Sequence, residues 1–279
     1  MINCHNSKYI IITMYPELIN SYLAFCQIRN ESYRTGKIDL SDREWFYPTT
    51  LLPLGDHIKK NKQNIKYIPP TRSSVNNYIE IMVDSLDPLS YDGQSFVPLI
   101  NLPKNDTTKA NKLLCGLYHE NEWIIVGGKE AYTWVINELV DNIYQHSEFN
   151  NAAVMAQRYE RKKFIELCFF DNGISIPGSY NKHLGREFNG IEAIREAING
   201  LSTKHEKGRG TGLADSIKLV SRGMKGEVMV VSDDGIFYKN QSDIDWYILK
   251  DEINKLNGTL ISIRIPFQKK EVLWYEYLK

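Results

Sequence analysis

The chain has 279 residues, enough for two ordinary domains or one large one, and its hydrophobic fraction of 42% is normal for a globular protein. Lys plus Arg and Asp plus Glu number 34 each, so the formal net charge is zero. A neutral chain has no overall field to attract nucleic acid or an anionic membrane, and we expect neither as a partner.

The cysteines and the N-terminus indicate the compartment. Cys4, Cys26, Cys115 and Cys168 form no C-x-x-C pair and have no metal-ligand spacing with histidine. The first residues lack a charged region followed by a long apolar stretch, and no window of the sequence is apolar enough for a transmembrane helix. We therefore expect a reducing, cytoplasmic setting.

The first part of the chain, residues 1–94, is predicted to form a small α/β unit. The expected strands cover 8–14, 37–40 and 64–68, and the expected helices cover 16–30, 48–60 and 74–83. Pro48 suits the first turn of a helix, and four apolar residues follow it at helical spacing: Leu51, Leu52, Leu54 and Ile58. Alternating strands and helices favour an α/β fold, and the polar stretch 84–94 is the predicted boundary.

The second part, residues 95–267, has longer elements. We expect strands at 96–102, 153–158, 164–170, 227–232, 235–239 and 259–266, and helices at 107–118, 129–146, 190–198 and 213–222. The last third lacks a repeated βαβ rhythm, so a mixed sheet covered by helices on one face is the predicted architecture. Residues 268–279 are predicted to be an aromatic-rich tail that packs back on this body.

The helix 129–146 carries a polar line beside its apolar stripe. Glu138, Asn142 and His146 stand at i, i+4 and i+8, and therefore share one helix face. An amide oxygen can coordinate Mg²⁺, and a carboxylate one turn away can orient or deprotonate an attacking hydroxyl or water. A solvated helix face is the alternative for this segment taken alone.

Two other stretches could complete a nucleotide site. The hydrophobic strand 164–170 delivers Asp171 at its end, followed by Asn172 and Gly173. Alone, this is typical of a tight turn; in a site, Asp171 would accept a hydrogen bond from the adenine amine, and Gly173 would let the base approach the backbone. The loop that follows opens with Pro177 and Gly178.

The second stretch is glycine-rich and directly precedes a predicted helix. It consists of Gly208, Arg209, Gly210, Thr211, Gly212 and Leu213. Glycines free the backbone to wrap phosphates, the helix N-terminus offers N–H groups, and Arg209 and Lys204 add charge. A flexible loop is the alternative. The pattern is neither a Walker loop nor a dinucleotide-binding turn.

In this order, the three stretches resemble the GHKL superfamily of ATP-binding domains, named for gyrase, heat-shock chaperones, histidine kinases and mismatch-repair ATPases. Glu138 to Asn142 resembles its N-box, and residues 171–178 and 208–213 resemble its two glycine boxes. Residues 202–204 are similar to the lid sequence of histidine kinases, and 258–267 to the closing strand. The resemblance implies a two-layer α/β sandwich with a mixed sheet, which binds ATP and Mg²⁺ under a mobile lid at 179–207.

The branch of the family follows from smaller features. None of the six histidines stands in a phosphoacceptor helix of the histidine-kinase kind, which argues against a sensor kinase. The spacing of Glu138, Asn142 and His146 is similar to that of the bacterial anti-sigma serine kinases. Glu138 also matches the general base of the gyrase and chaperone branches, but we expect no downstream domain here to supply the basic residue that usually completes their site. This departure puts efficient hydrolysis by the chain alone in doubt.

The N-terminal part is similar in layout to the STAS fold of anti-anti-sigma factors. The similarity rests on residues 38–41 and 45–51, and it puts Pro48 where that family has its phosphorylated serine. The acceptor is then lost unless the neighbouring Thr49 replaces it. An unrelated α/β domain is the open alternative.

We therefore expect a cytoplasmic regulator that binds Mg-ATP and transfers the γ-phosphate to a protein Ser or Thr. In this reading, Glu138 activates the hydroxyl, Asn142 holds Mg²⁺, and Asp171 binds adenine. The alternative is an ATP-dependent conformational switch, or slow ATPase, that controls a protein partner without kinase activity. The sequence leaves a homodimer open.

Overall fold

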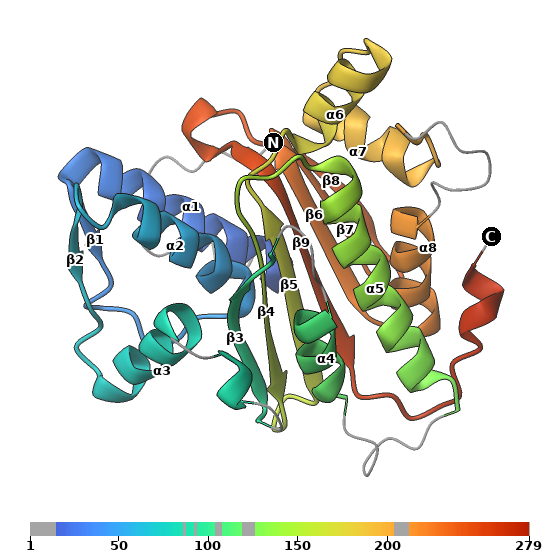
Figure 1. Ribbon diagram of the computed structural model, residues 1–279, viewed down its shortest axis with the longest axis horizontal. Coiled ribbons are helices and arrows are strands. Elements are labelled where there is room, and N and C mark those ends of the chain that lie inside the picture. Colours follow the sequence, from blue (N-terminus) through green and yellow to red (C-terminus); the bar gives the residue numbers. More distant parts are fainter. Residues whose placement is uncertain are drawn as a thin grey trace.

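The computed structural model describes residues 15–85, 88–91, 94–103, 108–118, 126–203 and 212–278. In this part of the chain, a seven-stranded sheet lies between two layers of helices (Figure 1). The strands are β3 (Phe96–Asn101), β4 (Ala152–Tyr159), β5 (Phe164–Asp171), β6 (Glu227–Asp233), β7 (Gly235–Lys239), β8 (Ile244–Ile248) and β9 (Leu256–Pro266). The α/β class expected from the sequence is confirmed.

The sheet is antiparallel throughout, with the strand order β3-β4-β5-β9-β6-β7-β8. The expectation of a mixed sheet was therefore wrong. Short turns join β4 to β5, β6 to β7 and β7 to β8, and such turns produce antiparallel pairs. The last strand, β9, then inserts between β5 and β6 and runs antiparallel to both.

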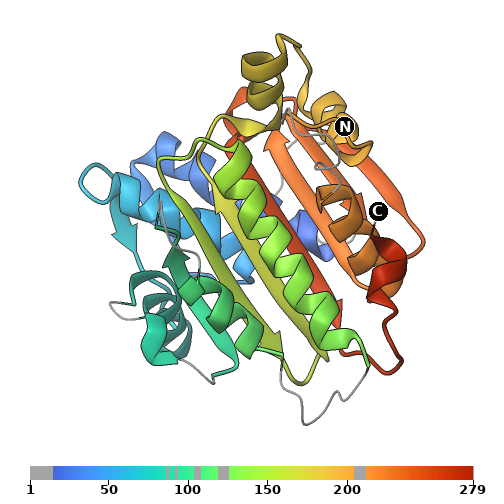
Figure 2. The same ribbon diagram turned by 45° about the vertical axis from the view of Figure 1, so that its right-hand side comes forward.

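One face of the sheet is covered by helices from the second part of the chain, residues 95–267 (Figure 2). The helices on this face are α4 (Thr108–Gly116), α5 (Gly128–His146), α8 (Gly212–Lys218) and the π-helical turn η4 (Leu219–Gly223). Successive side chains of a strand point to opposite faces, so Ile165, Leu167 and Phe169 of β5 pack against this layer. Here α5 contributes the apolar stripe that its sequence predicts, including Ile136, Leu139, Val140 and Ile143, all of them buried.

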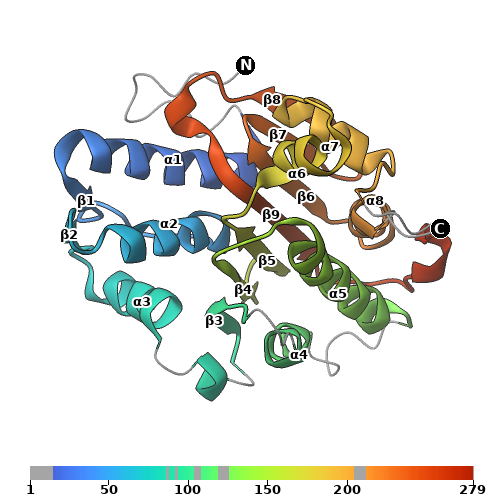
Figure 3. The same cartoon turned by 45° about the horizontal axis from the view of Figure 1, so that its top comes forward.

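The opposite face is covered by the N-terminal residues. Their elements are α1 (Glu17–Thr35), β1 (Lys37–Asp39), α2 (Pro48–Asn61), β2 (Lys66–Ile68) and α3 (Ser73–Asp84), with β1 and β2 forming a small parallel sheet. Cys168 and Phe170 of β5 belong to the same hydrophobic cluster as Leu18 and Leu52 of these helices. The sheet therefore has helices on both faces (Figure 3), and three layers replace the expected two.

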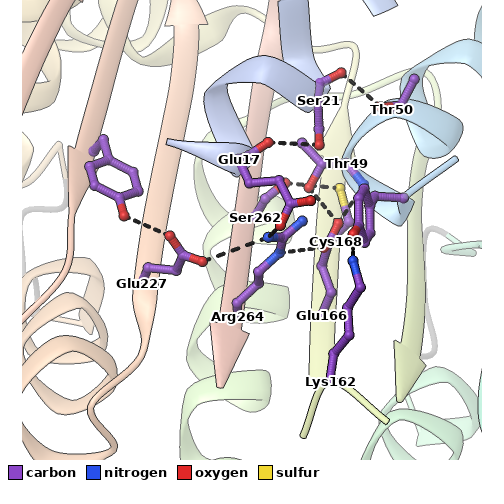
Figure 4. A network of polar contacts seen from close by, with 12 residues as sticks. Glu17, Ser21, Thr49, Thr50, Lys162, Glu166, Cys168, Glu227, Ser262 and Arg264 are labelled. Atoms are coloured by element: carbon purple, nitrogen blue, oxygen red, sulfur yellow. Dashed lines mark hydrogen bonds and ion pairs between the residues drawn. The ribbon is translucent and has the colours of Figure 1, made fainter. Parts of the chain in front are cut away.

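A buried ion-pair network joins α1 and α2 to the sheet (Figure 4). The Arg264 Nε on β9 donates to Glu166 Oε2 on β5 at 2.7 Å, and its guanidinium also pairs with Glu17 of α1. Glu166 is 0% exposed and Arg264 4%. Burial lowers the pKa of Arg264, but the facing carboxylates of Glu166 and Glu17 outweigh it and raise that pKa above its usual value.

Thr49, which follows Pro48 at the predicted acceptor position, is hydrogen-bonded to this network. Its backbone N–H and its hydroxyl both donate to Glu166 Oε1, at 2.9 and 2.7 Å. The side chain is 0% exposed, because Pro48 begins α2 directly against the sheet. The hydroxyl of Thr49 is therefore not accessible to a phosphoryl donor in this conformation.

Two further helices lie at the end of the sheet where β5 ends. They are α6 (Ser175–Leu184), which packs on β6 and β9, and α7 (Gly190–Ile198), which packs on β6, β7 and β8. The span predicted to be a lid, 179–207, contains α7 and the second part of α6, and α6 was not expected to be helical. Among the helices in the described residues, none combines the length and apolar character needed to cross a membrane.

Candidate functional site

A cavity of about 540 Å³ lies between α5, α6, α8 and the end of the sheet. Each of the predicted motifs contributes residues to its lining, but two glycines of the site prediction, Gly173 and Gly178, are not among them. Its walls include Glu138 and Asn142 of α5, Asp171 of β5, Gly212 of α8 and Thr259 of β9. Tertiary folding thus brings together residues that are far apart in the chain; Glu138 and Thr259, for example, are 121 positions apart.

One face of α5 supplies more of the lining residues than any other element of the described chain. This face includes Trp134, Glu138, Asp141, Asn142, Gln145 and His146. The residues recur at intervals of three and four, because the opposite face of the same helix is buried in the core. The sequence left open whether this helix face lines a site or is only a solvated surface. In the structure, it lines the cavity.

Asp171 is the buried acid of the cavity, with an exposed fraction of 3%. Its Oδ1 accepts the Gly173 N–H at 2.9 Å. Burial raises the pKa of Asp171 to about 7, and the backbone N–H groups of Gly173 and Thr259 lower it only in part. A carboxylate in such a place gains from any ligand that donates a hydrogen bond to it.

Two glycines hold the end of β5 in this position. A Cβ at Gly173 would lie 1.9 Å from the carbonyl oxygen of Ser147, and one at Gly258 would lie 1.9 Å from the carbonyl oxygen of Asp171. Gly258 also has a φ of +104°, which favours glycine. Gly173 therefore packs against the C-terminal end of α5. The space that a side chain would need at this position is occupied by the backbone of Ser147.

Gly212 has a different neighbour. A Cβ at this position would lie 2.1 Å from Glu138 Oε2, so only glycine leaves room for that carboxylate beside the first turn of α8. Leu213 also lines the cavity. The glycine-rich motif and the N-box-like motif therefore meet directly in the fold.

Two polar atoms of cavity-lining residues are buried without a hydrogen-bond partner among the described residues. They are Asn142 Nδ2 on α5 and Ser179 Oγ on α6. An unpaired buried polar group costs about 1–3 kcal/mol. Polar atoms in this state are suited to bind a ligand, and both residues line the cavity.

The approach to the glycine-rich segment is tied to α5. His146 Nδ1 lies 2.9 Å from Thr203 Oγ1, and Ser202 and Thr203 both line the cavity. On the other side, the Tyr180 hydroxyl donates to the Leu201 carbonyl at 2.6 Å. Residues 201–203, which precede the glycine-rich segment, are therefore held beside the cavity.

Some predicted residues lie elsewhere. Gly173 and Gly178 do not line the cavity, and the Gly178 N–H instead donates to Ser175 Oγ within α6. The residues of the site prediction that lie outside the described part of the chain are Lys204, Gly208, Arg209, Gly210 and Thr211.

Sequence reasoning missed several lining residues. Trp134 stands one turn before Glu138, so helical spacing could have identified it. Asp215 also lines the cavity, is 2% exposed and pairs with Lys218 at 3.3 Å. Ser179 and Leu278 had no signal in the sequence, because only the packing of α6 and of the C-terminal residues brings them there.

A scan against models of known protein families found no match to this chain, and a search among curated proteins found no relative. The geometry of the cavity therefore carries the functional argument.

Proposed function

We propose that this chain binds Mg-ATP in the cavity and transfers the γ-phosphate to a protein Ser or Thr, as a cytoplasmic regulator of a protein partner. The observation that carries the proposal is the convergence of Glu138, Asn142, Asp171 and Gly212 on one cavity. These residues come from the three motifs that resemble the GHKL superfamily. A chance resemblance of three short motifs gives no reason for them to meet in space.

The chemistry of the lining supports an adenine nucleotide. Asp171 is a buried acceptor for an exocyclic amine, and Ser179 adds a hydroxyl without a partner among the described residues. A cavity of about 540 Å³ lies within the usual range of small-molecule sites. With Asp171 ionised, an amine donor stabilises the charge that burial makes costly.

The residues also fit a magnesium ion that arrives with the nucleotide. In the described residues, no group of three or more His, Cys, Asp or Glu side chains could hold a metal by itself. Mg²⁺ typically takes one or two protein ligands and completes its shell with phosphate oxygens and water. The Asn142 Oδ1 would be that ligand, and the ion would offset the phosphate charge. The buried Asn142 Nδ2, which has no partner among the described residues, would donate to a phosphate oxygen.

Glu138 is the proposed general base. In the transfer, the acceptor oxygen forms a bond to the γ-phosphorus, the bond from that phosphorus to the β–γ bridging oxygen breaks, and ADP leaves. The proton of the acceptor hydroxyl passes to the Glu138 carboxylate. Gly212 keeps the space that the carboxylate occupies, so it positions Glu138.

Calorimetric titration of Mg-ATP tests the nucleotide site. We expect binding to wild type, no measurable binding to Asp171→Ala, and retained binding to Glu138→Gln. The matched control is Asp251→Ala, an acid outside the cavity. Failure of the wild type to bind Mg-ATP would refute the proposal.

The same variants separate the kinase from a conformational switch. If Glu138→Gln binds ATP but no longer phosphorylates the partner, the chain acts as a kinase. If Glu138→Gln keeps full biological activity and Asn142→Ala loses it, ATP works as a switch without phosphoryl transfer.

A further inference from the structure

The cavity has a direction, and α5 defines it. Ser147, at the C-terminal end of α5, accepts the Ile174 N–H at 2.8 Å and lies against Gly173, so Asp171 is at that end. Asn142, Glu138 and Trp134 follow toward the N-terminus of the helix. At 1.5 Å per residue, they lie about 8, 14 and 20 Å along the axis from Ser147.

This order gives each part of the cavity a place in the proposed reaction. The base of the nucleotide belongs beside Asp171, the metal and phosphates beside Asn142, and the transferred group beside Glu138. Trp134 lies a further turn along, about 6 Å beyond Glu138, and it still lines the cavity. In this assignment, the cavity continues past the part that belongs to the γ-phosphate.

The C-terminal residues close this far end. Val272 donates its N–H to the Val126 carbonyl at 2.9 Å, and Trp274 lies beside Gly127, so the tail passes the N-terminus of α5. The turn η6 (Trp274–Tyr277) then packs against α5 and η4 (Figure 2). Leu278 follows directly after this turn and lines the cavity.

Trp134 and Leu278 are both half-buried and apolar. A hydroxyl within hydrogen-bond reach of Glu138 would bring the atoms next to it against these two side chains. Apolar neighbours of the hydroxyl gain from this contact, whereas charged neighbours lose hydration. Asp141, exposed on the same wall, further disfavours an acidic neighbour.

We propose that Trp134 and Leu278 form the acceptor subsite of the cavity, and that the acceptor is a polypeptide Ser or Thr with a large apolar residue directly beside it. The inference rests on the proposed function, because it places the acceptor relative to Glu138. It adds the substrate class, which neither the motifs nor the nucleotide site specifies.

The test uses the full-length chain, Mg-ATP and a degenerate peptide library with a fixed central Ser or Thr. Wild type should phosphorylate peptides with Leu, Ile, Met or Phe next to the hydroxyl on the order of tenfold better than those with Asp, Glu or Gly. Trp134→Ala and Leu278→Ala should lose most of this preference and raise KM for the peptide, with KM for ATP unchanged. Trp45→Ala, a change at an exposed tryptophan on the other layer, is the matched control.

A second variant reverses the preference. Leu278→Lys puts a cation at the far end, so peptides with Asp or Glu next to the hydroxyl should become the better substrates. No phosphorylated peptide despite calorimetric Mg-ATP binding, or an unchanged preference in Trp134→Ala and Leu278→Lys, overturns the subsite. Absence of Mg-ATP binding in wild type instead refutes the proposed function itself.

Discussion

Replacement of Asp171 by Asn should stabilise the protein and abolish nucleotide binding. Burial raises the pKa of this carboxyl from 3.8 to about 7, so at pH 8 the folded protein holds an ionised group in a place that favours the neutral form. One pKa unit corresponds to about 1.36 kcal/mol, which gives a cost of roughly 4 kcal/mol at pH 8. Asparagine has nearly the same shape and removes this cost.

The pH dependence follows from the same shift. Because the folded-state pKa is raised, the protonated group favours folding fully below pH 3.8, and this contribution is lost as pH rises toward 7. The advantage of Asp171→Asn over wild type should therefore be about 4 kcal/mol at pH 8 and less than half of that at pH 5. Comparison of the two proteins cancels the groups they share.

Urea denaturation at pH 5, 6, 7 and 8 measures the difference in unfolding free energy. Its control is Asp251→Asn, an acid for which no such gain is expected because it lies outside the cavity. A difference that does not change with pH, or an Asp171→Asn protein less stable than wild type at pH 8, would refute the reasoning. Calorimetry on the same samples should show no Mg-ATP binding to Asp171→Asn, because the amide cannot accept as the carboxylate does.

Three further results are expected. Since ionised Asp171 accepts a hydrogen bond from adenine, the affinity for Mg-ATP should fall about tenfold between pH 8 and pH 6. Calorimetry at constant ionic strength measures this change, and an affinity that does not vary with pH contradicts the role of Asp171. Gly212→Ala should displace the Glu138 carboxylate and reduce phosphoryl transfer by at least about tenfold, with little change in Tm, whereas unchanged turnover would separate Gly212 from the site. Glu166→Gln should destabilise the fold by about 3–5 kcal/mol in urea, because it leaves Arg264 buried and incompletely paired; a loss below about 1 kcal/mol would show that the network is not needed.

The local elements of this fold were largely predictable. The helix Gly190–Ile198 begins and ends where the sequence predicts, because Asn189 and Glu192 form a capping box that is legible in the sequence. The long helix α5 followed from its apolar periodicity in the same way. For the candidate site, spacing on α5 was enough to group Glu138, Asn142 and His146 on one face.

Elements that depend on distant partners were missed. The helix α6 contains Pro177 and Gly178, which predict a loop, but Tyr180 is buried and the helix packs on β6 and β9. The strand β8 has a half-exposed pattern and exists through its pairing with β7. In both cases tertiary contacts override weak local signals.

The sequence by itself determined the α/β class, most of the helices and strands, and the residue types that suit an adenine nucleotide, because periodicity and motif spacing are local properties. The antiparallel order of the sheet, the merging of the N-terminal helices with its back face, and the burial of Thr49 depend on contacts between distant segments. Only the tertiary structure could bring Trp134 and Leu278 to the same cavity, since no local pattern links a helix face to the residues of a tail 144 positions later.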